Sequence, residues 1–447
     1  MSRHLLRRNI TAASAAGAAL GQNQDRYASL KTRVHQKLLS VLNMDAVKAE
    51  SRQELRREVQ SVLEKILRED HLPISMTERN RLAEEILDEV FGLGPLEPLL
   101  KDPTISDILV NTHKHVYIER HGKLVETAIR FQNDRHLLHI IEKIVSSVGR
   151  RIDESVPLVD ARLPDGSRVN AIIPPLAVDG PSLSIRRFGR KVLTNEELLR
   201  NQTLMQSMMT FLSACVEGRL NMVISGGTGS GKTTFLNCLS RFIPEHERVV
   251  TIEDTAELQL QLDDVVRMET RPPNIEGKGA ITQRQLLMTA LRLRPDRILL
   301  GEARGGEALD MLQAMGTGVE GSMTTVHANS PADAFSRLET MVMMAKLDLP
   351  SRFIRQQMAS VIQLLVQTSR LSDGTRKVTH IAEVVGLNDL NIEVENIFVF
   401  EQTGVGEDGR VLGRFMATGA SPRLLERLRV IGIQLPPGLF DEVVPVH

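Results

Sequence analysis

The chain has 447 residues, of which 42% are hydrophobic and 25% are charged, a composition typical of globular proteins with two or three cores. The net charge is −1 and only 3% of residues are aromatic, so neither a general attraction to nucleic acid nor extensive base stacking is expected. No uninterrupted apolar run approaches membrane-spanning length. The only cysteines, Cys215 and Cys238, imply no disulfide framework, and a reducing, cytoplasmic location is expected.

The first 75 residues are expected to form a disordered tail, 1–26, and a helical bundle, 27–75. The tail is basic and Ala-rich, and it lacks the Leu-rich core of a secretory signal. In the bundle, apolar residues recur at helical spacing, and over the whole stretch Lys and Arg outnumber Asp and Glu. A solvated basic face is the simpler interpretation, and a docking arm for a partner or a membrane surface is the alternative.

Residues 76–188 are expected to form an α+β domain. Helical periodicity starts at Thr77 and ends near Gly92. Three short strand patterns follow, and a longer helix is predicted over Arg135–Val148. The strand patterns are ISDILVN, VYIER and LVETAIRF.

The end of this domain carries arginines on predicted strands. In the stretch Asp160–Pro175, a Pro-Asp-Gly turn lies between two short alternating runs, which predicts a β-hairpin bearing Arg162 and Arg168. The strand pattern LSIRRF then presents Arg186. The polar stretch 189–202 is expected to be a hinge to the last domain, 203–447.

The stretch GGTGSGKTT lies between an apolar run, Met222–Ile224, and a helical pattern that begins at Thr233. Glycines in this spacing allow backbone N–H groups to surround phosphates at the start of a helix. Lys232 is expected to reach the β and γ oxygens of ATP, and the Thr233 hydroxyl to bind Mg²⁺. The predicted ATP-binding residues are Gly226, Gly227, Thr228, Gly229, Ser230, Gly231, Lys232, Thr233 and Thr234.

Strand and helix patterns alternate in the last domain, which predicts a doubly wound, parallel α/β sheet. Reacting groups collect at the carboxyl ends of strands in such sheets. Each of the predicted strands ends on a polar side chain, and the candidates among these are Glu253, Glu302 and His327. The predicted strands are MVIS (222–225), RVVTIE (248–253), VVRME (265–269), RILLGE (297–302) and SMTTVH (322–327).

One position departs from the usual pattern of P-loop enzymes. Gly301 stands where many of them place an Asp linked to Mg²⁺. Glu253 is therefore the candidate acid for Mg²⁺, and Glu302 is the candidate base for the attacking water, although these two roles can be exchanged. His327 is expected to bind the γ-phosphate or its water, with a structural role as the alternative.

Four ordered motifs carry a resemblance to a known family. GGTGSGKTT, TIEDTAEL, LRLRPDRILLGEARGGEA and GSMTTVHANSPADAFSRLETM resemble the Walker A, Asp box, Walker B and His box of the traffic ATPases of type II and type IV secretion. Further stretches, among them FGLGPLEPLLKDPTISDILVN, are similar to the CpaF branch, the ATPases of tight-adherence (Tad) pilus assembly. The resemblance covers about residues 77–440.

The resemblance implies a RecA-like ATPase domain in a homo-hexameric ring on the cytoplasmic face of the inner membrane. Such a ring couples ATP hydrolysis to pilin polymerisation through an inner-membrane platform protein. In these ATPases, arginines of the hairpin-and-strand region contact the phosphates, and Arg168 and Arg186 are the matching positions. Extension and retraction use the same hydrolysis chemistry, so both directions stay open.

Two other classes of function remain as alternatives. A nucleic-acid motor also has a P-loop and a ring, but the neutral charge and the scarcity of aromatic residues argue against it. An ATP-gated scaffold that does not hydrolyse ATP is the second alternative. The presence of Lys232, Thr233, Glu302 and His327 argues against that scaffold.

Overall fold

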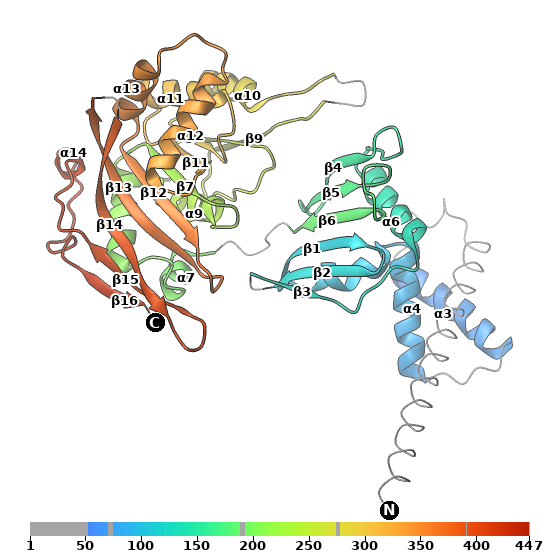
Figure 1. The fold of residues 1–447 in the computed structure, drawn as a ribbon. Coiled ribbons are helices and arrows are strands. Elements are labelled where there is room, and N and C mark those ends of the chain that lie inside the picture. Colours follow the sequence, from blue (N-terminus) through green and yellow to red (C-terminus); the bar gives the residue numbers. More distant parts are fainter. Residues whose placement is uncertain are drawn as a thin grey trace, which may run out of the picture. The chain divides into compact units, whose positions relative to one another are not determined.

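The computed structural model describes residues 52–69, 75–120, 122–187, 193–273, 278–389 and 391–446. The expected tail, 1–26, and the first half of the expected bundle, up to residue 51, lie outside the described residues. The chain divides into two compact units, one ending at Phe188 and the other starting at Gly189, and each is described by itself (Figure 1).

The first unit begins with a helical hairpin made of α3 (Arg52–Glu69) and α4 (Met76–Val90). Ser75 and Glu78 form a capping box that starts α4, because each accepts a hydrogen bond from the backbone N–H of the other. Helix α3 belongs to the expected bundle and α4 to the expected α+β domain, and the two helices share one hydrophobic core. That core contains Val59, Leu63, Ile66, Leu67, Leu82, Ala83, Ile86, Leu87 and Val90.

An antiparallel, six-stranded sheet in the order β3-β2-β1-β6-β5-β4 forms the rest of the first unit. Helix α6 (Asp134–Ser147) packs its apolar side chains, from Leu137 to Val145, into the core of this sheet. The expected strand over residues 124–131 is shorter, since β3 ends at Glu126. The other elements are η1 (Gly94–Leu96), α5 (Glu97–Lys101), β1 (Ile105–Thr112), β2 (His115–Arg120), β3 (Lys123–Glu126), β4 (Leu158–Arg162), β5 (Arg168–Ile172) and β6 (Ser182–Arg186).

The second unit is built on a ten-stranded sheet in the order β16-β15-β14-β13-β12-β7-β11-β10-β8-β9. The strands β7 to β11 are parallel, as predicted, and β12, for which no strand was predicted, is parallel to β7. Strands β13 to β16 continue the sheet antiparallel. The strands are β7 (Met222–Gly226), β8 (Val249–Glu253), β9 (Val265–Glu269), β10 (Arg297–Leu300), β11 (Met323–His327), β12 (Leu364–Arg370), β13 (Arg376–Asn388), β14 (Asn391–Val405), β15 (Val411–Ala417) and β16 (Val443–Val446).

Helices cover both faces of this sheet, which buries its central strands completely. Alternate residues of a strand face opposite sides, so Met222 and Ile224 pack with α8 and α9, whereas Val223 packs with α10 to α13. The helices are α7 (Asn195–Arg200), α8 (Gln206–Glu217), α9 (Lys232–Leu239), η2 (Ser240–Phe242), α10 (Gln283–Ala290), η3 (Leu291–Leu293), α11 (Glu307–Gly316), α12 (Pro331–Met343), α13 (Ser351–Val361) and α14 (Leu424–Val430). The unit is a P-loop, RecA-like α/β domain, and an α+β unit precedes it.

Two stretches of the second unit differ from the sequence-based expectation. The stretch 189–202, expected as a hinge, contains helix α7, which starts with a capping box of Thr194 and Glu197. Leu198 of this helix is buried in the core of the second unit. The strand expected to run to Glu302 ends at Leu300, so Gly301 and Glu302 lie in the loop that follows β10.

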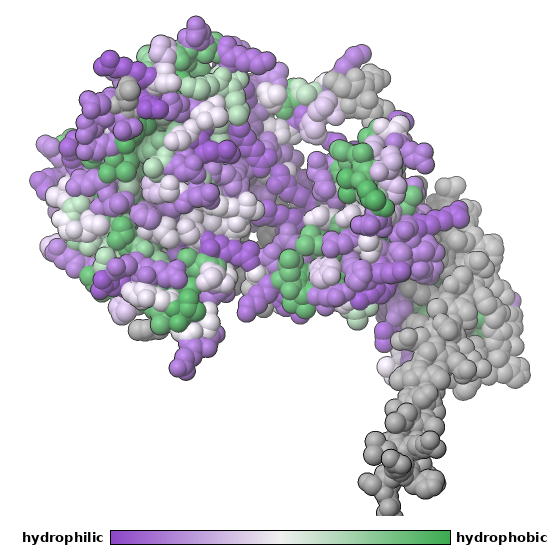
Figure 2. Space-filling view, in the orientation of Figure 1, coloured by the Kyte–Doolittle hydropathy of each residue, from purple (hydrophilic) through white to green (hydrophobic). Residues whose placement is uncertain are grey.

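The surfaces of both units are largely hydrophilic on the side that Figure 2 shows, with hydrophobic side chains in separate patches. One group of exposed apolar side chains falls within residues 343–353, between α12 and α13: Met343, Met344, Leu347 and Phe353. Among the described residues, no helix is both long enough and apolar enough to cross a membrane.

Candidate active site

The glycine-rich loop connects β7 to α9, and two hydrogen bonds within it share one acceptor, a backbone carbonyl oxygen. The ammonium of Lys232 donates to the carbonyl oxygen of Gly227 at 3.1 Å, and the N–H of Ser230 donates to the same oxygen at 3.3 Å. Gly229 and Gly231 have φ angles of +71° and +94°, which residues with a β-carbon rarely adopt. Two donors therefore converge on the Gly227 oxygen, and a phosphate oxygen that replaced it as acceptor would meet both.

Strand β12 is hydrogen-bonded to the start of the loop, although the paired residues are 138 and 143 positions apart in the sequence. Thr368 is 3.0 Å from the hydroxyl of Ser230 and donates to the carbonyl of Ser225 at 3.2 Å. Gln367 accepts from the Ser225 hydroxyl and donates to the carbonyl of Ala328. The register of β12 against β7 creates these contacts, and no local pattern near the loop predicts them.

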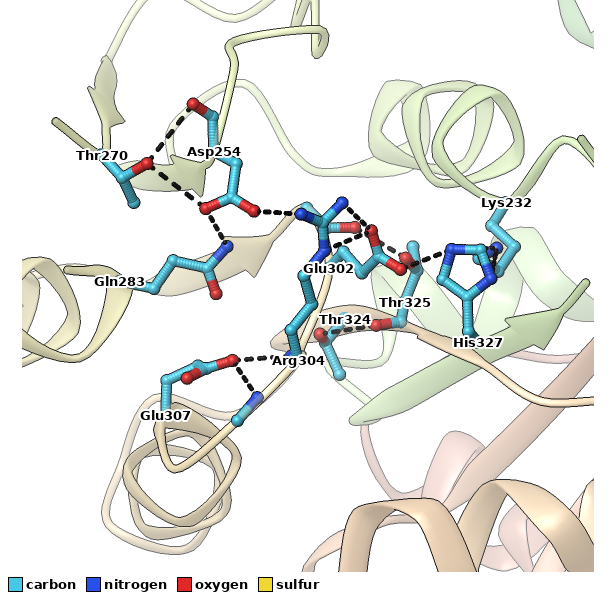
Figure 3. A network of polar contacts seen from close by, with 12 residues as sticks. Lys232, Asp254, Thr270, Gln283, Glu302, Arg304, Glu307, Thr324, Thr325 and His327 are labelled. Atoms are coloured by element: carbon cyan, nitrogen blue, oxygen red, sulfur yellow. Dashed lines mark hydrogen bonds and ion pairs between the residues drawn. The ribbon is translucent and has the colours of Figure 1, made fainter. Parts of the chain in front are cut away.

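A chain of polar contacts runs from Lys232 through His327 to Glu302 (Figure 3). Nε2 of His327 lies 2.6 Å from one oxygen of Glu302, and the ammonium of Lys232 lies 3.4 Å from both ring nitrogens. Burial lowers the pKa of His327, Glu302 raises it, and Lys232 lowers it again, so the net shift is downward. The structure thus brings together three residues singled out from the sequence, with the imidazole between a cation and a carboxylate.

Arg304 was not singled out from the sequence, and it contacts both Glu302 and Asp254. Its Nε and Nη2 donate to the second oxygen of Glu302 at 2.9 and 2.7 Å, and its Nη1 lies 2.7 Å from Asp254 (Figure 3). Asp254 also accepts from Gln283. The only signal in the sequence was a basic residue two positions after Glu302. Arg304 fixes the orientation of the Glu302 carboxylate relative to β8, since its fork of donors reaches both acids.

Glu253 ends β8 and is almost fully buried, at 3% exposure. One carboxylate oxygen accepts N–H groups of Glu257 and Leu258, at 2.8 and 3.0 Å. The other oxygen is buried without a hydrogen-bond partner among the described residues. Burial raises the pKa of Glu253 to about 7, against the opposing effect of the two N–H groups.

The packing around Glu253 explains the glycine at position 301. A β-carbon on Gly301 would lie 2.9 Å from Cγ of Glu253, so the Glu253 side chain fills the space where an Asp at 301 would start. A buried carboxylate oxygen without a partner fits a divalent cation, because hard cations prefer such ligands. Glu253 and the half-buried hydroxyl of Thr233 are the residues here that could hold Mg²⁺. Among the described residues no cluster of three or more His, Cys, Asp or Glu side chains forms a metal site, so nucleotide and water would complete the ligand set.

The candidate arginines Arg168 and Arg186 lie in the first unit, on β5 and β6. The register places Arg168 opposite both Arg186 and Arg162, so the three arginines form one row across neighbouring strands. Asp107 of β1 lies opposite Arg186 in the register. Asp160 accepts from Asn170, and Asp165 accepts from the backbone and hydroxyl of Ser167 in the predicted hairpin turn.

Comparisons with known proteins agree with the motifs. The family model described as "Type II/IV secretion system protein" matches residues 89–403, and that of the "Type II secretion system protein E, N-terminal domain" matches residues 27–91. The type IV secretion system protein VirB11 of Brucella suis is 33% identical over 323 residues, which cover 66% of this chain and 89% of the relative. The conjugal transfer protein TrbB of Rhizobium radiobacter is 30% identical over 307 residues, covering 68% and 91%. The crystal structure of the Brucella suis VirB11 ATPase in complex with sulphate is 30% identical, covers 66% of this chain and 97% of that one, and has a TM-score of 0.36.

Proposed function

Because the chain belongs to the family of type II/IV secretion system proteins, we propose that it is an ATPase that binds Mg·ATP on the loop from Gly226 to Thr234. The observation that carries this proposal is the contact chain from Lys232 through His327 to Glu302. It places a cation, an imidazole and a carboxylate side by side at the carboxyl ends of β7, β11 and β10.

Hydrolysis needs a water molecule that attacks the γ-phosphorus while the bond to the oxygen bridging β and γ breaks. Glu302 accepts the proton of this water and passes it on to the phosphate, and His327 holds the γ-phosphate or the water in place. Lys232 exchanges the Gly227 carbonyl for phosphate oxygens and balances the negative charge that leaves with ADP. Bound Mg²⁺ supplies further charge neutralisation at the β and γ oxygens.

The proposal is tested by phosphate release from purified protein. Wild-type protein releases phosphate from Mg·ATP, and Lys232→Ala loses hydrolysis and most of its affinity for the triphosphate. Turnover equal to that of the wild type in Lys232→Ala would show that the loop is not the nucleotide site. Binding of Mg·ATP without any phosphate release by the wild type would favour the ATP-gated scaffold instead.

The first unit, in this proposal, completes the site with Arg168 and Arg186. Like charges placed directly opposite each other on neighbouring strands are unfavourable. The row that these two residues share with Arg162 continues to Asp107 of β1, and its three positive charges against one negative charge suit it to an anion such as triphosphate. Charge that spreads over the γ oxygens during transfer is commonly stabilised by an arginine from another element.

Arg168→Ala or Arg186→Ala is therefore expected to lower turnover at least about tenfold while the fold stays intact. Arg130→Ala, an exposed arginine of the same unit paired with Glu126, is the matched control. Deletion of residues 1–51, which keeps α3 and the core that it shares with α4, should have a much smaller effect. Full activity of both arginine variants would exclude this role of the first unit.

We further propose that the protein acts as a homo-hexamer at the cytoplasmic face of the inner membrane. There it drives assembly of a Tad or type IV-like pilus, or protein secretion, through a platform protein, and the same hydrolysis chemistry serves extension and retraction alike. The support is the similarity of its motifs to that branch of the family, together with relatives named for type IV secretion and conjugal transfer. Light scattering of the purified protein tests the hexamer, and loss of pili in cells that carry Lys232→Ala tests the pathway. Salt-sensitive binding of DNA or RNA would favour the nucleic-acid motor instead.

A further inference from the structure

The outer side of the phosphate loop contacts an arginine from a distant hairpin. Nε of Arg376, the first residue of β13, donates to the carbonyl oxygen of Gly229 at 2.8 Å. A β-carbon on Gly231 would lie 3.2 Å from Cδ of Arg376, so the aliphatic part of this side chain packs against the loop as well. Arg370, the cross-strand partner of Arg376 on β12, also lies near the loop, since its Nη1 is 3.5 Å from the place of a β-carbon on Gly229.

The carbonyl that Arg376 binds belongs to the peptide unit between Gly229 and Ser230. A trans peptide is planar, and its N–H points opposite to its carbonyl. When Arg376 holds the Gly229 oxygen on the outer side, the N–H of Ser230 must point inward. It does so, because it donates to the Gly227 oxygen that Lys232 also binds. One bond outside the loop thus orients a phosphate donor inside it.

The hairpin between β12 and β13 holds Arg376 on a rigid support. Lys377 is 3% exposed, donates to the carbonyl of Gln202 at 2.6 Å and lies over the ring of Phe415. In the turn, Asp373 accepts from the backbone and hydroxyl of Thr375 and, from β15, the N–H of Val411. A side chain carried by such an anchored turn needs little reorganisation when the nucleotide binds.

We propose that Arg376 is a positioning residue that sets the orientation of the Gly229–Ser230 peptide and thereby the affinity of the loop for nucleotide phosphates. The inference rests on the proposed nucleotide site. Arg376 acts through Gly229 and is not required to touch the substrate. Its loss is therefore expected to weaken binding of both Mg·ADP and Mg·ATP and to leave the rate at saturation nearly unchanged.

Two substitutions separate the hydrogen bond from the charge. Arg376→Met keeps an unbranched side chain over Gly231 but has neither the donor nor the charge. Arg376→Gln loses the charge but carries an amide N–H at the same distance along the side chain as Nε. Arg414→Met on β15, which removes an exposed arginine paired with Glu401, is the matched control for loss of one positive charge from this unit.

The test measures equilibrium binding of a fluorescent ADP analogue with Mg²⁺, together with KM and kcat for ATP, on the full-length variants. Arg376→Met should raise the Kd and KM about tenfold or more, as expected for loss of a charge-assisted hydrogen bond. Arg376→Gln should raise them about threefold, and kcat should stay within about twofold in both. Arg414→Met should match the wild type.

The possible outcomes are distinct. An unchanged Kd in Arg376→Met would overturn the proposal, and so would equal losses in the Met and Gln variants, because charge alone would then account for the effect. A fall in kcat at unchanged KM would make Arg376 a catalytic residue instead. Absence of nucleotide binding in the wild type would refute the nucleotide site itself, which is a separate result.

Discussion

The substitution Glu253→Gln is expected to stabilise the protein at alkaline pH. Burial raises the pKa of Glu253 to about 7 from its ordinary value of 4.5. Ionised Glu253 is therefore held in a place where its charge is poorly solvated. An amide of the same shape has no charge to bury, and its oxygen can still accept the N–H groups of Glu257 and Leu258.

The size of the effect follows from proton linkage. Between pH 4.5 and pH 7 the folded protein binds the proton of Glu253 more tightly than the unfolded chain does, so stability is highest below this window and is lost as pH rises through it. The full loss for such a shift is about 3 kcal/mol, of which about 2–3 kcal/mol falls between pH 5 and pH 8. For a unit of this size, that corresponds to roughly 5–10 °C in melting temperature.

Calorimetry of the wild type and Glu253→Gln at pH 5 and pH 8 measures this difference. The wild type should lose stability relative to the variant as pH rises, and titrating groups common to both proteins cancel in the comparison. Glu407→Gln, at an exposed turn position, controls for the loss of one negative charge. Parallel melting temperatures of wild type and Glu253→Gln at the two pH values would refute the description of Glu253 as a buried acid with a raised pKa.

The remaining predictions concern the acids and the membrane. Glu302→Gln should still bind Mg·ATP but hydrolyse it about 10²–10⁴-fold more slowly; if instead Glu253→Gln abolishes turnover at saturating Mg²⁺ and Glu302→Gln does not, the two roles are exchanged. Gly301→Ala should displace Glu253 and lower turnover at least about tenfold with nucleotide binding retained, whereas Gly404→Ala, where a β-carbon meets nothing within 4 Å, should be neutral. In cell fractionation the protein should be soluble when its platform partner is absent, and retention on membranes would point to residues 27–75 as a lipid anchor.

Local patterns were enough to predict the phosphate loop and the strands around it. The loop is contiguous in sequence, and glycine spacing, an apolar strand and a helix start are all local signals. Predicted strand ends also led to Glu253, Glu302 and His327, because parallel strands align their carboxyl ends at one edge. The hairpin that carries Arg168 followed from its Pro-Asp-Gly turn, which is again a local feature.

Long-range packing determines the contacts that local patterns do not predict. Arg376 meets Gly229 across 147 positions because β12 pairs with β7 and β13 pairs with β12, and strand order is not encoded in any short segment. The antiparallel strands β13 to β16 had no sequence-based prediction at all. The glycine at position 301 looked like a missing acid until the structure showed the Glu253 side chain packed over it. The sequence thus determined which chemical groups are present, whereas tertiary packing determined which atoms meet. Burial and strand register set the distances between side chains, and these distances do not follow from the spacing of the residues along the chain.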